Sequence, residues 1–261
     1  MPPVKSAALV LSSRQYRDTS RIICFYSQAA GRVDCVAKGV LTARAKTMTA
    51  LEPLSLVEII YYSRSSNGLH TLAQSAYLDP FPGIRGDLIK TAFASVISEM
   101  LKTLFFLQEQ NTRLFDLSVA FMKNLSGLEK DNIISNSYFL LWLFIIHMLR
   151  FAGLSFSDNI CVKCDTGDET QLSGFSVPHG GFICGKCAKQ QMHTVSISRD
   201  CYCLLRDLNT RRFSFFKDKA LAIEPDFITG LLINFLKYHM GKDIRLKSLD
   251  FLYGLVEKDR K

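Results

Sequence analysis

The stretch CVKCDTGDETQLSGFSVPHGGFICGKC, residues 161–187, contains two Cys-x-x-Cys pairs and divides the chain. Two thiolates three residues apart can bind one side of a tetrahedral ion, and a loop of about fifteen to twenty residues can fold back to present a second pair. We therefore predict one structural zinc ion, because four thiolates fill its coordination shell and leave no position for water or substrate. The predicted ligands are Cys161, Cys164, Cys184 and Cys187. The alternative, four plain buried thiols, is disfavoured by the paired spacing.

The residues between the two pairs favour a small ribbon. Phe175 to Val177 form a short apolar run, residues 178–181 (Pro-His-Gly-Gly) provide a turn, and Phe182-Ile183 leads into the second pair. His179 and His193 lie close enough in sequence to compete as ligands. Because four cysteines already suffice, we expect both imidazoles to lie outside the coordination shell.

The four-cysteine segment, which we call the zinc knuckle, is preceded by a chain that changes from a strand pattern to a helix pattern. Five short runs with β-branched, aromatic or alternating residues read as strands: residues 6–12, 21–26, 32–38, 54–62 and 69–77. In the third run, Val33, Cys35 and Ala37 should point inward, and Arg32, Asp34 and Lys38 outward. Asn67-Gly68 is a strong hairpin signal between the last two runs. The count predicts a five-stranded oligonucleotide-binding (OB) barrel, with a five-stranded SH3-like barrel as the alternative.

After Pro82 the apolar period becomes about 3.6 residues, which predicts helices at residues 88–107, 112–125 and 135–152. The third is apolar enough to resemble a membrane span. Its uninterrupted apolar run, residues 138–146, is far shorter than about 20 residues, so it reads as the buried spine of a helical bundle. Residues 198–208, 225–240 and 246–255 predict three more helices beyond the knuckle.

These elements predict an α+β protein: an N-terminal five-stranded OB-fold barrel, then a mostly α-helical body with an inserted four-cysteine zinc knuckle. We expect four segments: an OB-fold nucleic-acid-binding domain at residues 1–80, the first part of a helical bundle at 81–158, the knuckle at 159–192, and a helical C-terminal part at 193–261 that packs on the bundle.

The basic residues concentrate near the N-terminus, which predicts a polyanion-binding surface there. The chain carries a formal net charge of +8, and residues 1–50 hold only two acidic side chains, Asp18 and Asp34. The candidate DNA-binding residues are Arg14, Arg17, Arg21, Arg32, Lys38, Arg44 and Lys46. Tyr16 and Tyr26 could add base stacking, although Tyr26 fits a core position equally well. A secondary basic patch of Lys237, Lys242, Arg245 and Lys247 reads by itself as a solvated helix face.

The pattern gives little support to an enzyme. The His-Glu-x-x-His and zinc-deaminase motifs are absent from the sequence. Residues 180–187 nearly spell a phosphate-binding P-loop, but Cys187 stands where Ser or Thr should bind magnesium. Eight cysteines without a secretory signal peptide favour a reducing cytoplasm. Cys24, Cys35, Cys201 and Cys203 then read as core thiols.

With these features assembled, the chain resembles the bacterial recombination mediator RecO family. The similarity rests on Leu9-Val-Leu-Ser-Ser-Arg14, Asp18-Thr-Ser-Arg21, Gly31-Arg-Val, Val36-Ala-Lys-Gly39 and Leu51-Glu-Pro53, and near the end on Gly241 followed by Leu246-Lys-Ser248. The chain departs from the family at Asp18, where Glu is usual, and in a less basic loop at residues 41–49.

The resemblance implies a non-enzymatic DNA-repair function. Such proteins bind single- and double-stranded DNA, anneal complementary strands, and help RecR load RecA onto DNA coated with single-strand-binding protein, whose acidic C-terminal tail they also bind. Two alternatives remain open from the residues: an RNA- or ribosome-associated zinc-ribbon protein, and a zinc-dependent hydrolase. Competition between DNA and RNA oligonucleotides would distinguish the first alternative from a DNA-binding protein. A zinc site with an open coordination position would indicate the second.

Overall fold

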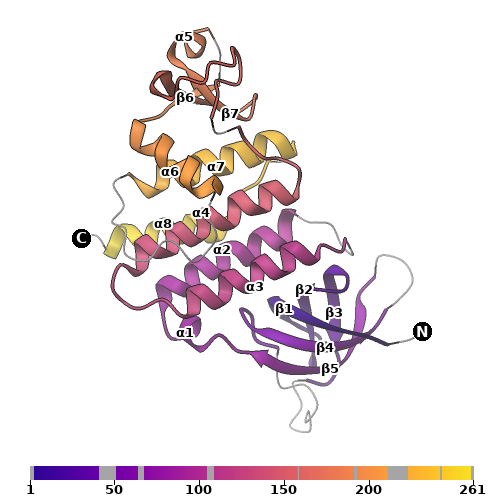
Figure 1. The fold of residues 1–261 in the computed structure, drawn as a ribbon. Coiled ribbons are helices and arrows are strands. Elements are labelled where there is room, and N and C mark those ends of the chain that lie inside the picture. The colour runs from indigo at the N-terminus through magenta and orange to yellow at the C-terminus, as the bar shows by residue number, and fades with distance from the viewer. Residues whose placement is uncertain are drawn as a thin grey trace. The chain divides into compact units, whose positions relative to one another are not determined.

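A computed structural model describes residues 3–40, 51–63, 68–104, 109–157, 159–190, 193–210, 223–241 and 243–259 (Figure 1). The chain forms two compact units. The first comprises residues 1–128 together with 246–261, and the second comprises residues 129–245. The last helix therefore belongs to the same unit as the N-terminal barrel, although the whole second unit separates them in sequence.

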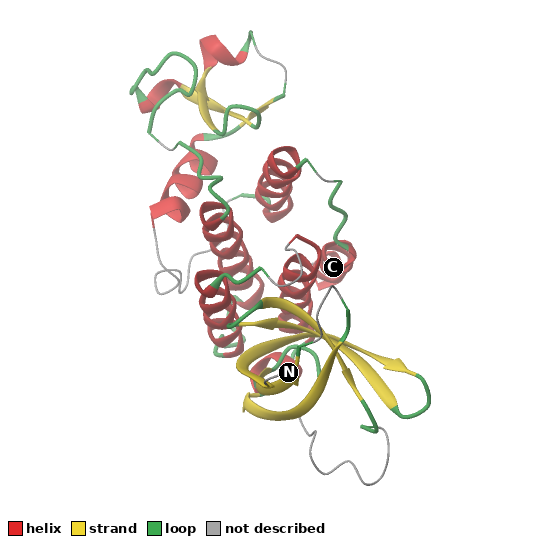
Figure 2. Cartoon of the chain, turned by 90° about the vertical axis from the view of Figure 1, so that its right-hand side faces the viewer, coloured by secondary structure: helices red, strands yellow, loops and turns green. Residues whose placement is uncertain are grey.

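The barrel of the first unit is closed and has five strands. These are β1 (Pro3–Tyr16), β2 (Ser20–Ser27), β3 (Gly31–Ala37), β4 (Leu56–Tyr62) and β5 (His70–Asp79). Their order is β1-β2-β3-β5-β4, with β1 paired to β4 and β3 parallel to β5. Because β5 lies between β3 and β4, this is the Greek-key order of an OB fold, and the SH3-like alternative is wrong. Figure 2 shows the strands curling around one another in yellow.

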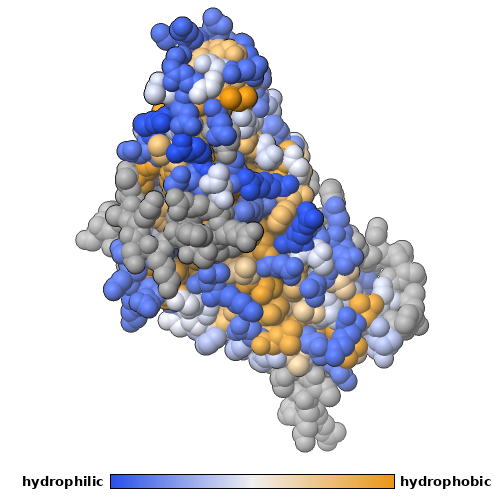
Figure 3. All heavy atoms as spheres, viewed as in Figure 1, coloured by the Kyte–Doolittle hydropathy of each residue, from blue (hydrophilic) through white to orange (hydrophobic). Residues whose placement is uncertain are grey.

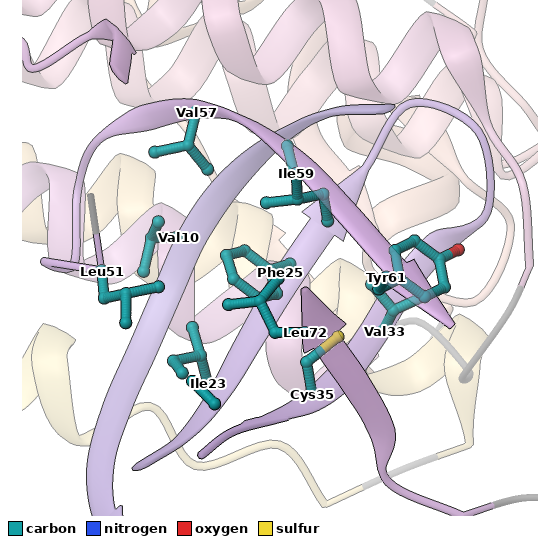
Figure 4. Packing of buried hydrophobic residues seen from close by; sticks show 12 residues of the cluster. Val10, Ile23, Phe25, Val33, Cys35, Leu51, Val57, Ile59, Tyr61 and Leu72 are labelled. Carbon is teal, nitrogen blue, oxygen red and sulfur yellow. The ribbon is translucent and has the colours of Figure 1, made fainter. Parts of the chain in front are cut away.

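The barrel interior is filled by alternate residues of each strand, as the sequence pattern predicts. On β3, Val33, Cys35 and Ala37 are fully buried in the core, which Figure 4 shows in close view. Arg32 and Asp34 lie on the outer face, where they form an ion pair with 3.2 Å between Arg32 Nη2 and Asp34 Oδ2. The expected inward and outward directions on this strand are therefore confirmed. Asn67 of the predicted hairpin turn lies outside the described residues, but β4 and β5 pair antiparallel.

The described part of the first unit also has four helices: α1 (Pro82–Arg85), α2 (Leu88–Leu104), α3 (Thr112–Ser126) and α8 (Lys247–Asp259). The central one is α2, which contacts α3, the outer face of β1 and β2, and α8. The N-terminus of α8 is capped by Glu99 of α2, whose carboxylate accepts hydrogen bonds from the backbone N–H groups of Lys247 (3.2 Å) and Ser248 (2.8 Å). An acidic side chain at this position satisfies donors that a helix cannot pair internally.

The second unit is built on α4 (Ile133–Phe151), with α6 (Arg199–Thr210) and α7 (Pro225–Met240) packed on it. Among the described helices, α4 is the one long and apolar enough to cross a membrane. Of its most apolar 18-residue window, 72% is buried inside the protein, as in a core helix. Trp142 of α4 is fully buried and donates a 2.9 Å hydrogen bond to Thr229 of α7. The segment boundaries expected from sequence stay a prediction.

The knuckle of the second unit is a three-stranded sheet with the order β7-β6-β8. Its elements are a 3-10 turn (Glu169–Gln171), β6 (Leu172–Ser176), β7 (Gly181–Cys184), α5 (Gly185–Ala188) and β8 (Thr194–Ser196). The pairing of β6 with β7 confirms the predicted ribbon, while the edge strand β8 has too few apolar residues to stand out in the sequence. Hydrophilic side chains cover most of the knuckle surface visible at the top of Figure 3.

Candidate functional site

Four cysteine thiols gather in the knuckle as a possible metal site. The Sγ atoms of Cys161, Cys164, Cys184 and Cys187 all lie within 4.8 Å of one another, and those of Cys164 and Cys184 are 3.8 Å apart. Tetrahedral zinc with Zn–S bonds of about 2.3 Å would hold its sulfur ligands roughly 3.8 Å apart. The spacing of the described thiols therefore fits the ion that the sequence predicts.

The two cysteine pairs are positioned by different local structures. The first lies in a tight turn in which Asp165 N–H donates to the carbonyl of Cys161 (2.9 Å), with Asp165 in the left-handed region at φ 57°. The second pair starts where β7 ends, and α5 carries Cys187 back toward the first pair. A 3.4 Å hydrogen bond from the Cys184 backbone N–H to Cys161 Sγ joins the two halves. Such N–H groups stabilise thiolate charge.

The electrostatics of the cluster also favour a cation. Burial opposes ionisation of Cys161, but backbone N–H groups of Cys184, Lys163 and Cys164 outweigh it and lower the pKa of its thiol to about 6. The pKa of Cys187 is raised to about 12, by desolvation first and then by the neighbouring sulfur atoms. Ionisation of Cys187 beside the other sulfur atoms is therefore unfavourable, and a divalent cation would remove that repulsion.

Histidines do not join the cluster in the described part of the chain. His179 Nδ1 is 3.1 Å from Ser176 Oγ, within the turn of the ribbon. The four remaining cysteines also differ from the cluster: Cys24, Cys35 and Cys201 are buried and Cys203 is half-buried. Burial raises the pKa of Cys201 to about 12, and burial together with Asp34 does the same for Cys24. These two thiols are therefore neutral at physiological pH.

The knuckle is fixed to the helices of its unit by an aromatic cluster that the sequence does not reveal. Phe156 contacts Phe175, Phe182 and Phe235 edge-on, with ring centroids 5.6 to 6.3 Å apart.

A second contact joins the knuckle to α6. The guanidinium groups of Arg199 and Arg206 lie 4.7 and 5.5 Å from the ring centroid of Tyr202. Glu169 of the knuckle forms ion pairs with both arginines. Its partners are 30 and 37 residues away in sequence, so no local pattern marks them.

The strand register brings four predicted DNA-binding residues to one end of the barrel. Tyr16 pairs with Ser20 at the β1–β2 turn, which holds Arg17, and Arg21 pairs with Ala37, the last residue of β3 before Lys38. Arg14, Arg17 and Lys38 are exposed, and Arg21 is half-buried. Arg14 and Arg21 lie on opposite faces of the sheet, because Arg14 pairs with the outward Ile22 and Arg21 with the inward Ala37. They therefore surround the barrel end rather than line one face.

Other predicted site residues are not part of this group. Arg32 lies at the far end of β3, where it pairs with Asp34 and donates a 2.7 Å hydrogen bond to the Lys102 carbonyl. Tyr26 is fully buried, so it belongs to the core, whereas Tyr16 is 36% exposed and lies beside Arg17. Arg44, Lys46 and Lys242 fall outside the described residues. Of the secondary patch, Lys237 and Arg245 belong to the second unit and Lys247 to the first.

A closed OB barrel, a helical body and a four-cysteine knuckle define a class of multidomain OB-fold proteins. Comparison with known families gives the particular one. Residues 1–81 match "Recombination protein O N terminal" and residues 85–250 match "Recombination protein O C terminal". The chain therefore belongs to the Recombination protein O family.

Curated relatives support the same assignment over nearly the full length. The chain is 32% identical to a DNA repair protein RecO from Desulfatibacillum aliphaticivorans over 260 residues, which cover 98% of each chain. It is 25% identical to the protein of the same name from Desulforamulus reducens, covering 98% of this chain and 96% of the relative. It is 26% identical to the DNA repair protein RecO from Anaeromyxobacter dehalogenans, covering 97% of this chain and 96% of the relative.

Proposed function

We propose that this protein is a DNA-binding recombination mediator. It binds single- and double-stranded DNA, anneals complementary strands, and works with RecR to load RecA onto DNA coated with single-strand-binding protein. The observation that carries this proposal is the group of cations around one end of an OB barrel, in a chain of the Recombination protein O family. We call Arg14, Arg17, Arg21 and Lys38 the barrel-end cluster.

The barrel-end cluster supports binding to the phosphate backbone rather than to particular bases. Its members come from the ends of three strands, β1, β2 and β3, and from the β1–β2 turn, so their charges converge on one end of the barrel. Lysine and arginine contacts to phosphate displace condensed counterions, and the resulting affinity is strong, salt-dependent and largely independent of sequence. Holding two complementary strands on one cationic surface also reduces their mutual repulsion, which promotes annealing without covalent chemistry.

The remaining parts of the molecule take supporting roles in this proposal. The knuckle holds one structural zinc ion in a closed set of four thiolates, and no catalytic residue is assigned. The helical body binds protein partners, RecR and the acidic C-terminal tail of single-strand-binding protein. The protein acts in the cytoplasm, where the cysteines stay reduced.

Strand annealing tests the proposal directly. Two complementary oligonucleotides, bare or coated with the cognate single-strand-binding protein, are mixed with wild type or with an R14A/R21A/K38A variant. Wild type should anneal both without a nucleotide cofactor, and the variant should lose most of the activity. An R113A/K123A/K130A variant removes the same charge from two exposed positions of α3 and one exposed position between α3 and α4, and should retain activity. Zinc content and circular dichroism of each variant establish that it is folded.

Two results would contradict the proposal. Failure of wild type to bind DNA at low salt would remove its basis. Preferential binding of an RNA oligonucleotide over the DNA of the same sequence would favour the RNA-associated alternative instead.

A further inference from the structure

A cavity of about 540 Å³ lies within the first unit, between β1, the residues that precede β4, and one face of α2. This volume is in the range of small-molecule sites, about 300–1,000 Å³. One wall is apolar, formed by Leu11, Pro53 and Leu54. The opposite wall is a row of hydroxyl side chains on α2. The cavity is distinct from both the knuckle and the barrel-end cluster.

The hydroxyl wall presents mainly hydrogen-bond acceptors. The Thr91, Ser95 and Thr103 hydroxyls donate to carbonyls in or next to α2, those of Ile84 (2.8 Å), Thr91 (2.7 Å) and Glu99 (2.7 Å). Their hydrogens are therefore committed, while their oxygens keep lone pairs for a ligand. Ser98 is 5% exposed, and its hydroxyl has no hydrogen-bond partner among the described residues. Ser98 keeps its hydrogen, so it is a donor beneath a wall whose other three hydroxyls present acceptors. A buried hydroxyl without a partner is costly, so a ligand group that pairs with it gains free energy.

A cation lies beside the cavity and connects it with the barrel. Lys102 Nζ donates a 3.3 Å hydrogen bond to Ser12 Oγ of β1. Ser12 and Arg14 are two residues apart on the outer face of β1, so their side chains lie about 6.6 Å apart along the strand. Lys102, Ser12 and Arg14 thus form a line that leads from the barrel-end cluster to the cavity. The Glu99 carboxylate is directed to the N-terminus of α8, which offsets its charge.

The apolar wall is held in an uncommon backbone conformation. Leu54 has φ 61°, in the left-handed region that branched side chains rarely adopt. Its N–H donates a 2.9 Å hydrogen bond to the carbonyl of Val10, and the N–H of Val10 donates to the carbonyl of Ser55 at the same distance. Such strained residues are concentrated at ligand sites, where the surrounding structure fixes them.

We propose that this cavity binds one nucleotide of a single strand held at the barrel end. The phosphate lies at Lys102 and Ser12, and the base inserts between the apolar wall and the hydroxyls of α2. Because that wall presents acceptors, it favours a base with an exocyclic amine. Cytosine has an amino group where thymine has a carbonyl oxygen. The site therefore prefers cytosine to thymine. This inference rests on the proposed DNA-binding function.

The test compares oligodeoxycytidylate with oligodeoxythymidylate of equal length in equilibrium binding to the full chain. Wild type should bind the cytosine oligomer about fivefold more tightly or better, because a thymine carbonyl facing an acceptor would be unpaired. S95M fills the cavity and should abolish this ratio. K102A should weaken both oligomers several-fold, whereas K123A, which removes an exposed cation from α3, should behave as wild type.

The outcomes separate this inference from the proposed function. If wild type binds both oligomers equally and S95M and K102A match it, while R14A/R21A/K38A loses binding, the cavity proposal is overturned and the DNA-binding proposal stands. If wild type binds neither oligomer, the function itself fails. If an acidic peptide with a free carboxylate binds wild type but not S95M, and oligonucleotide binding is unchanged in S95M, the cavity is a peptide site and the nucleotide proposal is wrong.

Discussion

At the scale of single residues, identical side chains have opposite chemistry because their surroundings differ. Cys161 receives backbone N–H groups that lower its pKa, whereas burial raises the pKa of Cys201. A cysteine is therefore a candidate metal ligand at position 161 and a core thiol at position 201. The distinction depends on which backbone donors face the sulfur atom.

Replacing one cluster thiol tests the structural role of the proposed zinc. C187A should lose stoichiometric zinc and reduce the free energy of unfolding by about 4 kcal/mol or more, because zinc binding contributes directly to folding. Zinc analysis and thermal unfolding measure both effects. C203A, at a half-buried thiol outside the cluster, is the matched control and should keep its zinc. Undiminished zinc content and stability in C187A would contradict a closed four-thiolate site.

His70 should make the barrel sensitive to acid. Its side chain is buried, and burial lowers its pKa below the ordinary value of 6.5 against an opposing effect of Asp34. The unfolded chain therefore binds the proton more readily, so His70 contributes stability above about pH 6.5 that is lost as the pH falls toward the lower folded pKa. Urea unfolding at about pH 7.5 and about pH 5.5 measures the loss. H70Q should show a smaller difference; an equal difference would exclude His70 as the cause.

At the scale of elements, one buried hydrogen-bond chain joins α4 to α7. Trp142 Nε1 donates to Thr229 Oγ1, and that hydroxyl donates to the Pro225 carbonyl at 2.8 Å. Both side chains are fully buried. The link fixes the rotation of two very apolar helices, whose nonpolar contacts alone have little directional preference.

The T229V substitution measures this link. Valine keeps the shape of threonine but leaves the indole N–H buried without an acceptor, so the free energy of unfolding should fall by about 1–3 kcal/mol. Chemical denaturation gives the value. T112V, at an exposed threonine of α3, should change stability by no more than about 0.5 kcal/mol. A loss in T229V no larger than in T112V would mean that the indole finds another partner.

At the scale of the whole molecule, charge distribution governs the proposed DNA binding. Each cation that contacts a phosphate of single-stranded DNA makes the slope of log affinity against log salt more negative by about 0.7. Removing Arg14, Arg21 and Lys38 should therefore make this slope less negative by about 2. A salt titration of oligonucleotide binding measures it. An unchanged slope would show that these residues are not at the DNA surface.

Local sequence patterns determined much of this protein. Alternation in residues 32–38 predicted the inward and outward faces of β3, and the paired cysteines predicted the thiol cluster, because both are set by the period of a strand or by neighbours in a turn. Apolar periodicity of about 3.6 residues likewise predicted the helices, because the period of a helix is also a local property of the sequence. The resemblance to the RecO family rested on short motifs, and the family is confirmed.

Only the tertiary structure decided features that join distant residues. The barrel closure between β1 and β4, the aromatic cluster around Phe156, and the α2 cavity with Lys102 have no local signature. The opposite faces of Arg14 and Arg21 follow from the register of β1 and β2, in which Arg21 pairs with Gln15 rather than with Arg14. The packing of α8 on α2 pairs Glu99 with residues about 150 positions later, since a helix end accepts any well-placed carboxylate. Sequence periodicity sets the face of an element, but three-dimensional packing sets its partner.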